Sequence, residues 1–112
     1  MTRGDIWWAS IPGPIGSEPG GRRPVLVMQT NAFNESNIRT VIVVVLTSNL
    51  RLAEAPGNVL IPRADSGLTS DSVANISRVV TLDKGMLNDR VGPLLLELVE
   101  QVADGLRLCL EL

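Results

Sequence analysis

Residues 39–46, Arg-Thr-Val-Ile-Val-Val-Val-Leu, limit the fold of this chain more than any other segment. Most of these side chains are β-branched, which favours extended backbone. From Val41 onward the run has no polar residue at alternate positions, a pattern typical of a strand buried on both faces. Polarity returns abruptly at Thr47-Ser48-Asn49. We therefore expect a central strand over 39–46 that ends at Thr47.

Shorter apolar segments predict further strands at residues 6–9, 24–30, 58–62 and 78–82. Residues 11–23 contain three prolines and four glycines, so we expect them to form a loop. A second, polar loop with a short helical turn is expected over residues 31–37.

One helix is predicted near the end of the chain. Gly92-Pro93 would open it and Gly105 would stop it, because proline suits a first helical position and glycine a C-terminal one. Its apolar side chains recur at helical spacing, namely Leu95, Leu98, Val99, Val102 and Leu106. Residues 106–112 are expected to form a last strand, with Cys109 as a small buried hydrophobe. Strands followed by one helix indicate a single α+β domain over residues 1–112, a small antiparallel β-barrel with a C-terminal helix.

Two adjacent tryptophans, Trp7 and Trp8, lie in the first predicted strand. Successive residues of a strand face opposite sides, so only one of the two rings can pack in the core. The other is expected on a surface or an interface. Packing against a partner and stacking on a nucleobase are both open interpretations for it.

The chain has no histidine and no tyrosine. This absence excludes histidine general acid–base catalysis, histidine-containing triads and nearly all zinc sites. The net charge of −2 argues against nonspecific binding of long duplexes. The cations are nine arginines and one lysine; arginine suits bidentate contacts to phosphates and bases, although a GC-rich genome would give the same bias.

Several features bear on location. The apolar run 41–46 is far shorter than the roughly 20 residues that span a bilayer. The first residues carry charge and lack the apolar core of a signal peptide. A single cysteine cannot form an intramolecular disulfide and is compatible with a reducing compartment. We expect a cytoplasmic protein.

Residues 16–24, Gly-Ser-Glu-Pro-Gly-Gly-Arg-Arg-Pro, bring two arginines to the start of an apolar strand. A loop of this composition allows close approach to an anion. The spacing of Gly16 and Gly21 matches a nucleotide-binding P-loop, but Arg22-Arg23 replaces the required lysine and hydroxyl residue. A strand follows, where a P-loop requires a helix. A nucleoside triphosphatase is therefore not expected.

Three segments in register resemble the MazF/PemK (Kid) toxin family. The first comprises Arg3-Gly4-Asp5-Ile6-Trp7-Trp8 and the loop at 16–24 with its following Val25-Leu26-Val27. The second is the apolar strand at 40–47 that ends in threonine. The third is Asp71-Ser72-Val73, followed by Thr81-Leu82-Asp83-Lys84. The resemblance extends over essentially the whole chain.

This resemblance implies an SH3-like barrel that works as a homodimer and is neutralised by a cognate MazE-like antitoxin. It implies a sequence-specific, metal-independent endoribonuclease that cleaves single-stranded mRNA without a cofactor. The 2′-hydroxyl would attack the adjacent phosphate and leave a 2′,3′-cyclic phosphate and a 5′-hydroxyl. An arginine suits the charge that develops at phosphorus, because its forked donors match phosphate oxygens.

The family's functional positions fall on named residues of this chain. Arg23 corresponds to the catalytic arginine, Thr47 to the catalytic threonine, and Glu18 to an acidic residue that orients the arginine or acts as base. The expected RNA-binding residues are Ser17, Gly20, Gly21, Arg22, Ser48, Pro56, Ser77 and Arg78. Structural roles are also open: Arg23 could pair with Glu18 or Asp5, and Thr47 could bond its own backbone. Ser77-Arg78 departs from the acidic and amide residues that read bases in relatives.

Two other functions remain open from the sequence. One is a non-enzymatic gyrase poison like CcdB, which shares this architecture but grips its target through its C-terminal residues. The predicted buried strand at 106–112 argues against it. The other is an inactive β-barrel interaction module, against which the presence of both Arg23 and Thr47 argues.

Overall fold

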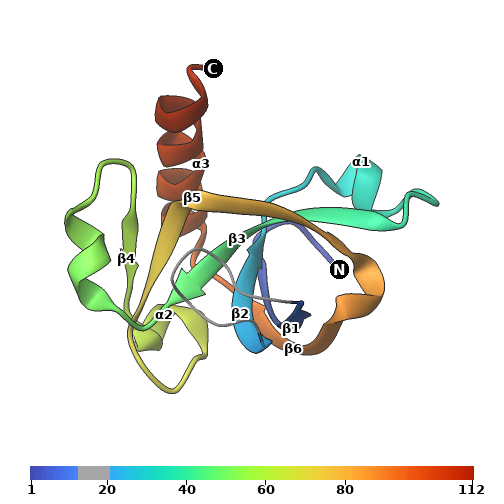
Figure 1. Ribbon diagram of the computed structural model, residues 1–112, viewed down its shortest axis with the longest axis horizontal. Helices are drawn as coiled ribbons and strands as arrows, with labels where there is room; N and C mark the ends of the chain where they lie inside the picture. The colour runs from blue at the N-terminus through green and yellow to red at the C-terminus, as the bar shows by residue number, and fades with distance from the viewer. Residues whose placement is uncertain (13–20) are drawn as a thin grey trace.

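The structure is a computed structural model that describes residues 1–12 and 21–112 (Figure 1). Three of the predicted site residues, Ser17, Glu18 and Gly20, lie outside these ranges. The strands are β1 (Asp5–Ile11), β2 (Gly21–Val27), β3 (Thr40–Thr47), β4 (Val59–Ile61), β5 (Ser72–Asp83) and β6 (Leu87–Pro93). The helices are α1 (Asn31–Asn34), α2 (Arg63–Ser66) and α3 (Leu96–Leu110), with 3₁₀ turns η1 (Leu50–Glu54) and η2 (Lys84–Met86).

The six strands form one antiparallel sheet in the order β4-β5-β3-β2-β1-β6. The sheet curls into a half-barrel, and the long β5 bends across it from β4 to the far end of β3 (Figure 1). The register between β3 and β5 shifts between Val44 and Leu46, which lets β5 bend there. The predicted antiparallel barrel with a C-terminal helix is confirmed.

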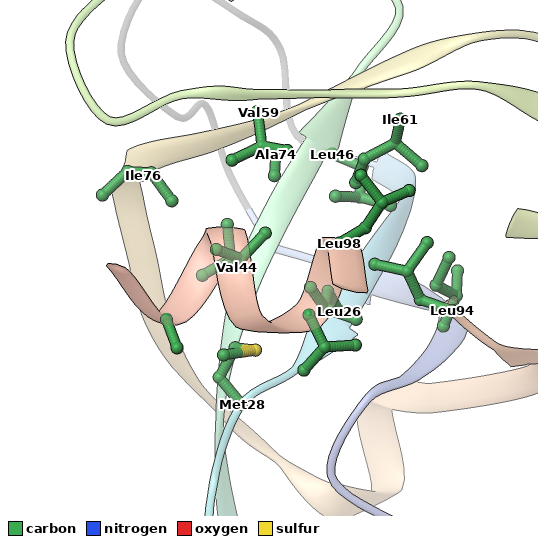
Figure 2. Packing of buried hydrophobic residues seen from close by; sticks show 14 residues of the cluster. Leu26, Met28, Val44, Leu46, Val59, Ile61, Ala74, Ile76, Leu94 and Leu98 are labelled. Atoms are coloured by element: carbon green, nitrogen blue, oxygen red, sulfur yellow. The ribbon is translucent and has the colours of Figure 1, made fainter. Parts of the chain in front are cut away.

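The core has two parts, one on each face of the sheet. Alternate residues of β3 divide between them: Val44 and Leu46 belong to the first cluster, while Val43 and Val45 belong to the second. The first cluster packs against α3 through Leu98 and its neighbours (Figure 2). The prediction that this strand is buried on both faces is therefore confirmed, and it explains why the run has so few polar residues.

The C-terminal helix differs from its prediction at both ends. Pro93 closes β6, and α3 begins at Leu96 and continues to Leu110, so residues 106–112 do not form a strand. Cys109 is exposed on the helix and not buried. The sequence pattern also failed to predict β6 itself.

Gly105 is inside the helix because the helix touches the Gly57 turn there. A Cβ at Gly105 would lie 2.2 Å from the Gly57 carbonyl oxygen and 3.1 Å from Ile76 Cγ1. The glycine therefore permits a close approach of helix and loop and does not end the helix. The local propensity of glycine therefore does not stop α3, which continues to Leu110 with its last residues exposed.

The strand that follows the glycine-rich loop begins earlier than predicted. β2 starts at Gly21, so Arg22 and Arg23 belong to the strand and pair with Ser10 and Ala9 of β1. Their backbone positions are consequently fixed by the sheet. The side chains of Arg22 and Arg23 leave β2 on opposite faces, because the side chains of successive strand residues alternate.

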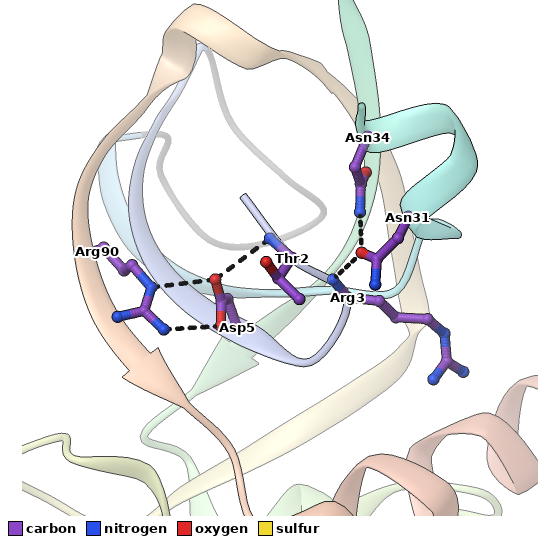
Figure 3. A network of polar contacts seen from close by, with 6 residues as sticks. All are labelled: Thr2, Arg3, Asp5, Asn31, Asn34 and Arg90. Carbon is purple, nitrogen blue, oxygen red and sulfur yellow. Dashed lines mark hydrogen bonds and ion pairs between the residues drawn. The ribbon is translucent and has the colours of Figure 1, made fainter. Parts of the chain in front are cut away.

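A polar network fixes the N-terminal segment to the sheet (Figure 3). The buried Asp5 carboxylate accepts hydrogen bonds from Arg90 Nε and Nη2, both at 3.1 Å, and from the Thr2 backbone N–H at 3.2 Å. The hydrogen bonds that Arg90 donates to Asp5, together with the negative charge of Asp5, raise the pKa of Arg90 above its ordinary value. Asn31 Oδ1 accepts from the Arg3 N–H at 2.7 Å and from Asn34 Nδ2 at 3.1 Å, which anchors α1.

In the described part of the chain, no helix has the length and apolar character needed to cross a membrane.

Candidate functional site

The register of β2 and β3 brings Arg23 and Thr47 to the same place. Val25 pairs with Val45, and two residues further toward this end of the sheet are Arg23 on one strand and Thr47 on the other. Residues that face each other on antiparallel strands have their side chains on the same face. Strand alternation therefore puts Arg23 and Thr47 on the side of Val25 and Val45, just beyond the last paired residues of the two strands.

A first cavity of about 290 Å³ opens at this end of the sheet. Its apolar wall includes Trp8, which pairs with Pro24, and Leu46 at the corresponding position of β3. Polar side chains complete the lining, namely Arg22, Arg23, Ser48, Thr69, Ser70 and Ser72. The cavity thus combines two guanidinium groups with hydroxyl donors, a set suited to an anion such as a phosphodiester.

Arg22 is held in place by two neighbours. Its guanidinium lies 4.6 Å from the centroid of the Trp8 ring and forms an ion pair with Asp89. Asp89 faces Trp8 across β1 and β6, so the strand pairing brings carboxylate and ring together. Both members of the ion pair are more than half exposed, so its stabilising effect is small, whereas its effect on the position of Arg22 is direct.

Thr47 makes the local bond that was one of its two predicted roles. It is 6% exposed, and its hydroxyl oxygen accepts a hydrogen bond from the Asn49 backbone N–H at 3.2 Å. This bond uses one acceptor position of the hydroxyl and not its proton. A structural role for Thr47 therefore does not preclude hydrogen bonding to a ligand.

A second cavity, of about 520 Å³, lies beyond Asn49. Three of the predicted RNA-binding residues, Pro56, Ser77 and Arg78, line it. It is also lined by Asn49, Leu52, Ala55, Asn58, Asn75, Ile76 and Cys109. The cavity is rich in amide side chains, which offer both donors and acceptors.

Hydrogen bonds order this amide cluster. Asn75 Oδ1 accepts from Ser77 Oγ at 3.1 Å and from Asn58 Nδ2 at 3.4 Å. Asn58 also accepts from the Ile76 N–H at 2.9 Å and donates to the Leu52 carbonyl at 2.8 Å. Asn58 thereby links the loop before β4 to the middle of β5.

Six of the predicted site residues line these two cavities, Arg22, Arg23 and Ser48 the first and Pro56, Ser77 and Arg78 the second, whereas Thr47 and Gly21 line neither. Ser48 lines the first with Arg22 and Arg23, and Asn49 lines the second. Gly21 lies at the exposed start of β2 with a φ of 125°, a conformation that favours glycine.

Sequence reasoning missed several lining residues. Thr69, Ser70 and Ser72 were not among the predicted site residues, although Ser72 lies in the third segment of the resemblance, Asp71-Ser72-Val73. Asn58 and Asn75 are 17 positions apart, and only the pairing of β4 with β5 brings their segments together. The run of hydroxyl residues before β5 was the one local signal available.

Among residues 1–12 and 21–112, no group of three or more cysteine, aspartate or glutamate side chains is arranged to hold a metal ion.

Comparison with known proteins assigns a family. The chain matches the family described as PemK-like, MazF-like toxin of type II toxin–antitoxin system over residues 2–110. It is 46% identical to endoribonuclease MazF6 of Mycobacterium tuberculosis over 112 residues, 100% of this chain and 98% of that protein. Endoribonuclease EndoA of Bacillus subtilis is 36% identical over 112 residues, 100% of this chain and 96% of EndoA. A solved structure of a mycobacterial endoribonuclease with its cognate antitoxin is similar with a TM-score of 0.78 and 26% identity, covering 100% of this chain and 96% of that one. The chain therefore belongs to the PemK-like, MazF-like toxin family of type II toxin–antitoxin systems.

Proposed function

We propose that this protein is a sequence-specific, metal-independent endoribonuclease that cleaves single-stranded mRNA. The observation that carries the proposal is a cavity at the end of the sheet that is lined by two arginines and by hydroxyl side chains, with Thr47 between the lining residues Leu46 and Ser48. The names of relatives that are 36% and 46% identical over the whole chain support the same activity. Family membership supports its role as a toxin.

The reaction begins when a ribose 2′-hydroxyl attacks the adjacent phosphorus. The new bond joins the 2′-oxygen to phosphorus, the bond from phosphorus to the 5′-oxygen breaks, and the products carry a 2′,3′-cyclic phosphate and a 5′-hydroxyl. The proton of the 2′-hydroxyl must leave and the departing 5′-oxygen must gain one. Arg23 stabilises the negative charge that builds on the phosphate oxygens during this exchange.

The other residues have supporting roles in this reaction. The Thr47 hydroxyl donates a hydrogen bond to a phosphate oxygen, and Glu18 orients Arg23 or accepts the 2′-proton. Arg22, Ser48 and the loop residues Ser17, Gly20 and Gly21 contact the RNA backbone. Arginine itself is a poor base, since a guanidinium stays protonated far above neutral pH, so charge stabilisation is the assignment we give to Arg23.

The second cavity holds the bases that flank the cut. Ser77 and Arg78 present hydrogen-bonding groups there, and Pro56 provides an apolar edge. Unstacked bases of single-stranded RNA are recognised through such hydrogen bonds to their edges. The amide cluster and Arg78 together determine the cleavage motif.

We further propose that the protein acts in the cytoplasm as a homodimer and is neutralised by a MazE-like antitoxin. The solved complex of a mycobacterial relative with its cognate antitoxin supports the last point. Exposed leucines on α3, Leu108 and Leu110, supply apolar surface for association. Light scattering at micromolar concentration should give the mass of a dimer, and a monomer would contradict this part.

The gyrase-poison alternative is not favoured, but the reason differs from the one that the sequence suggested. The C-terminal segment is an exposed helix end and not a buried strand, so that argument is wrong. The relatives named as endoribonucleases decide instead. A supercoiling assay with gyrase should show no inhibition.

The test of the proposal is cleavage of single-stranded RNA by the purified chain in EDTA. We expect cuts at one short motif, with cyclic phosphate on one product and a 5′-hydroxyl on the other. Replacing the nucleotide on the 5′ side of the cut by its 2′-deoxy form should abolish cleavage, because the attacking group is gone. Loss of activity in EDTA, or cleavage of the deoxy substrate, would contradict the mechanism.

A further inference from the structure

We propose that Trp8 is a stacking platform for one nucleobase next to the cleaved phosphate, and that Arg22 and Asp89 position it. This inference rests on the proposed RNA-cleaving function. It adds to that function a binding position for a base on the side of the site that holds the catalytic arginine.

The position of Trp8 in the sheet brings its ring close to Arg23. β1 lies between β2 and β6, and Trp8 pairs with Pro24 on one side and Asp89 on the other. Its ring is half-buried and lines the same cavity as Arg23. A base stacked on this ring would therefore belong to a nucleotide close to the phosphate that Arg23 contacts.

The composition of the cavity wall carries the second step. Trp8, Pro24 and Leu46 form an apolar surface, while Ser48 and Ser72 provide hydroxyl groups beside it. A nucleobase has apolar faces and polar edges, so this arrangement matches it in both respects. Stacking on tryptophan tolerates any base, which suits a position that binds without reading sequence.

The Arg22 contact carries the third step. A guanidinium is flat and cationic, and it lies 4.6 Å from the centroid of the Trp8 ring while Asp89 holds it from β6. The attraction between the cation and the aromatic face restricts the movement of the ring. Arg22 and Asp89 are thus positioning residues for the platform, and Arg22 also brings positive charge to the RNA backbone.

The neighbouring Trp7 shows what a structural tryptophan looks like in the same strand. Trp7 packs against the second core cluster together with Met1, Val80 and Met86. Its Nε1 is buried and has no hydrogen-bond partner within the described part of the chain. Strand alternation therefore gives the two rings different surroundings, and Trp8 is the one that reaches the cavity.

The test uses single-stranded RNA that contains the mapped cut site, with a 2′-deoxy nucleotide there to block cleavage. A series of such oligonucleotides replaces one base at a time by an abasic position. For the wild-type chain, we expect one position beside the cut at which loss of the base weakens binding about five- to a hundredfold. Trp8→Leu should weaken binding of the intact RNA by a similar factor and lose its sensitivity at that position alone. Trp8→Phe should keep most of both effects.

Comparing the abasic series between Trp8→Leu and the wild-type chain shows whether the Trp8 ring stacks on a base or only packs within the protein. If Trp8→Leu retains the wild-type sensitivity at every abasic position, the ring only supports the fold and the inference is wrong. Ser10→Ala, on the same face of β1, is the matched control and should bind as wild type does. Should Trp8→Leu not fold, Trp7→Phe leaves Trp8 as the sole tryptophan. Saturating RNA should then change its fluorescence, and an unchanged spectrum would overturn the inference.

The outcome for the proposed function is separate. Absence of cleavage of natural RNA by the wild-type chain would contradict the nuclease, and the platform would then be tested by the Trp8 fluorescence of Trp7→Phe with single-stranded RNA, which needs no mapped cut site. The platform, and not the nuclease, would be contradicted if the wild-type chain cleaves RNA normally while Trp8→Leu and the loss of a base weaken binding additively at every abasic position.

Discussion

The two cavities beside the end of β3 are close in space but differ in their chemistry. The first contains two arginines, and a guanidinium can only donate hydrogen bonds. The second contains Asn49, Asn58 and Asn75, whose amides both donate and accept. A phosphate needs donors alone, whereas a base edge presents a pattern of both. This difference supports our proposal that RNA is cut on the Ser48 side and read on the Asn49 side.

The cavities also differ in what supports them. The first rests on paired residues of four strands, β1, β2, β3 and β5, within the sheet. The second depends on Asn58 hydrogen bonds and on the contact between the Gly57 turn and Gly105 of α3. Loops and helix contacts tolerate change more readily than a sheet register does. Substitutions should accordingly alter the motif of cleavage more easily than they alter its chemistry.

The largest expected effect comes from Arg23→Ala. Removing one preorganised donor to developing charge lowers kcat by roughly 10²–10³-fold in enzymes that depend on such contacts. We expect a loss of this size with an unchanged cleavage motif, measured by single-turnover cutting of a labelled RNA. Arg23→Lys should recover only part of the rate, because an ammonium cannot bind two oxygens in a fork. Wild-type cleavage by Arg23→Ala would remove the basis of the proposed mechanism.

Thr47→Val should have the next largest effect. The substitution removes the hydroxyl that we propose donates to the phosphate and that accepts from the Asn49 N–H. We expect kcat to fall about tenfold or more, because a hydrogen bond to an anionic phosphate oxygen is lost, and stability to fall by about 1 kcal/mol, because the neutral bond from the Asn49 N–H is lost. Thr47→Ser keeps the hydroxyl and serves as the control. Equal activity of the valine and serine variants would assign Thr47 a structural role only.

The sequence predicted those parts of the fold that depend on local pattern. The strand ending at Thr47 followed from its apolar run, and the opposite orientation of Trp7 and Trp8 followed from strand alternation. The predicted ends of α3 were wrong because Gly92-Pro93 and Gly105 have the composition of helix boundaries. Gly105 in fact meets a constraint from Gly57, which is distant in sequence.

For the candidate site too, the sequence could not predict contacts that depend on residues distant along the chain. Arg23 and Thr47 were identified by family resemblance, and both lie just beyond the last paired residues of β2 and β3, at the same end of the sheet. The Asn58–Asn75 contact could not be predicted, because it depends on the pairing of β4 with β5. β6 was missed because Asn88, Asp89 and Arg90 give it no apolar alternation.

Gly105→Ala tests the support of the second cavity. The new Cβ would lie 2.2 Å from a backbone oxygen, so the helix and the Gly57 turn must separate. We expect a loss of roughly 1–3 kcal/mol in the free energy of unfolding, by chemical denaturation. Gly85→Ala is the matched control, because nothing lies within 4 Å of the position that its new methyl group would take. The folded Gly105→Ala fraction should lose motif selectivity before it loses cleavage rate; the reverse order would contradict the separation of the two cavities.

Arg78→Ala should have the smallest effect and gives the sharpest test of that separation. Arg78 lines the second cavity and lies on the other side of Asn49 from Arg23. Hydrogen bonds to a base edge discriminate by roughly 1–3 kcal/mol, so a relaxed preference of about fivefold or more is expected at one position of the motif. The rate at the best site should stay within a few-fold of wild type, because no contact to the phosphate is lost.

The control for this variant is Arg107→Ala, which removes the same charge from the exposed face of α3, where Arg107 pairs with Asp104. Each substitution removes one positive charge from a chain whose net charge is −2. If the contribution of Arg78 were purely electrostatic, Arg78→Ala and Arg107→Ala would both weaken cutting, and each would do so equally at all sites. Sequencing of RNA ends from a randomised pool separates these outcomes. If Arg78→Ala leaves the distribution of cut motifs unchanged, base reading must be assigned to the amides of Asn49, Asn58 and Asn75, which the same experiment can then examine one at a time.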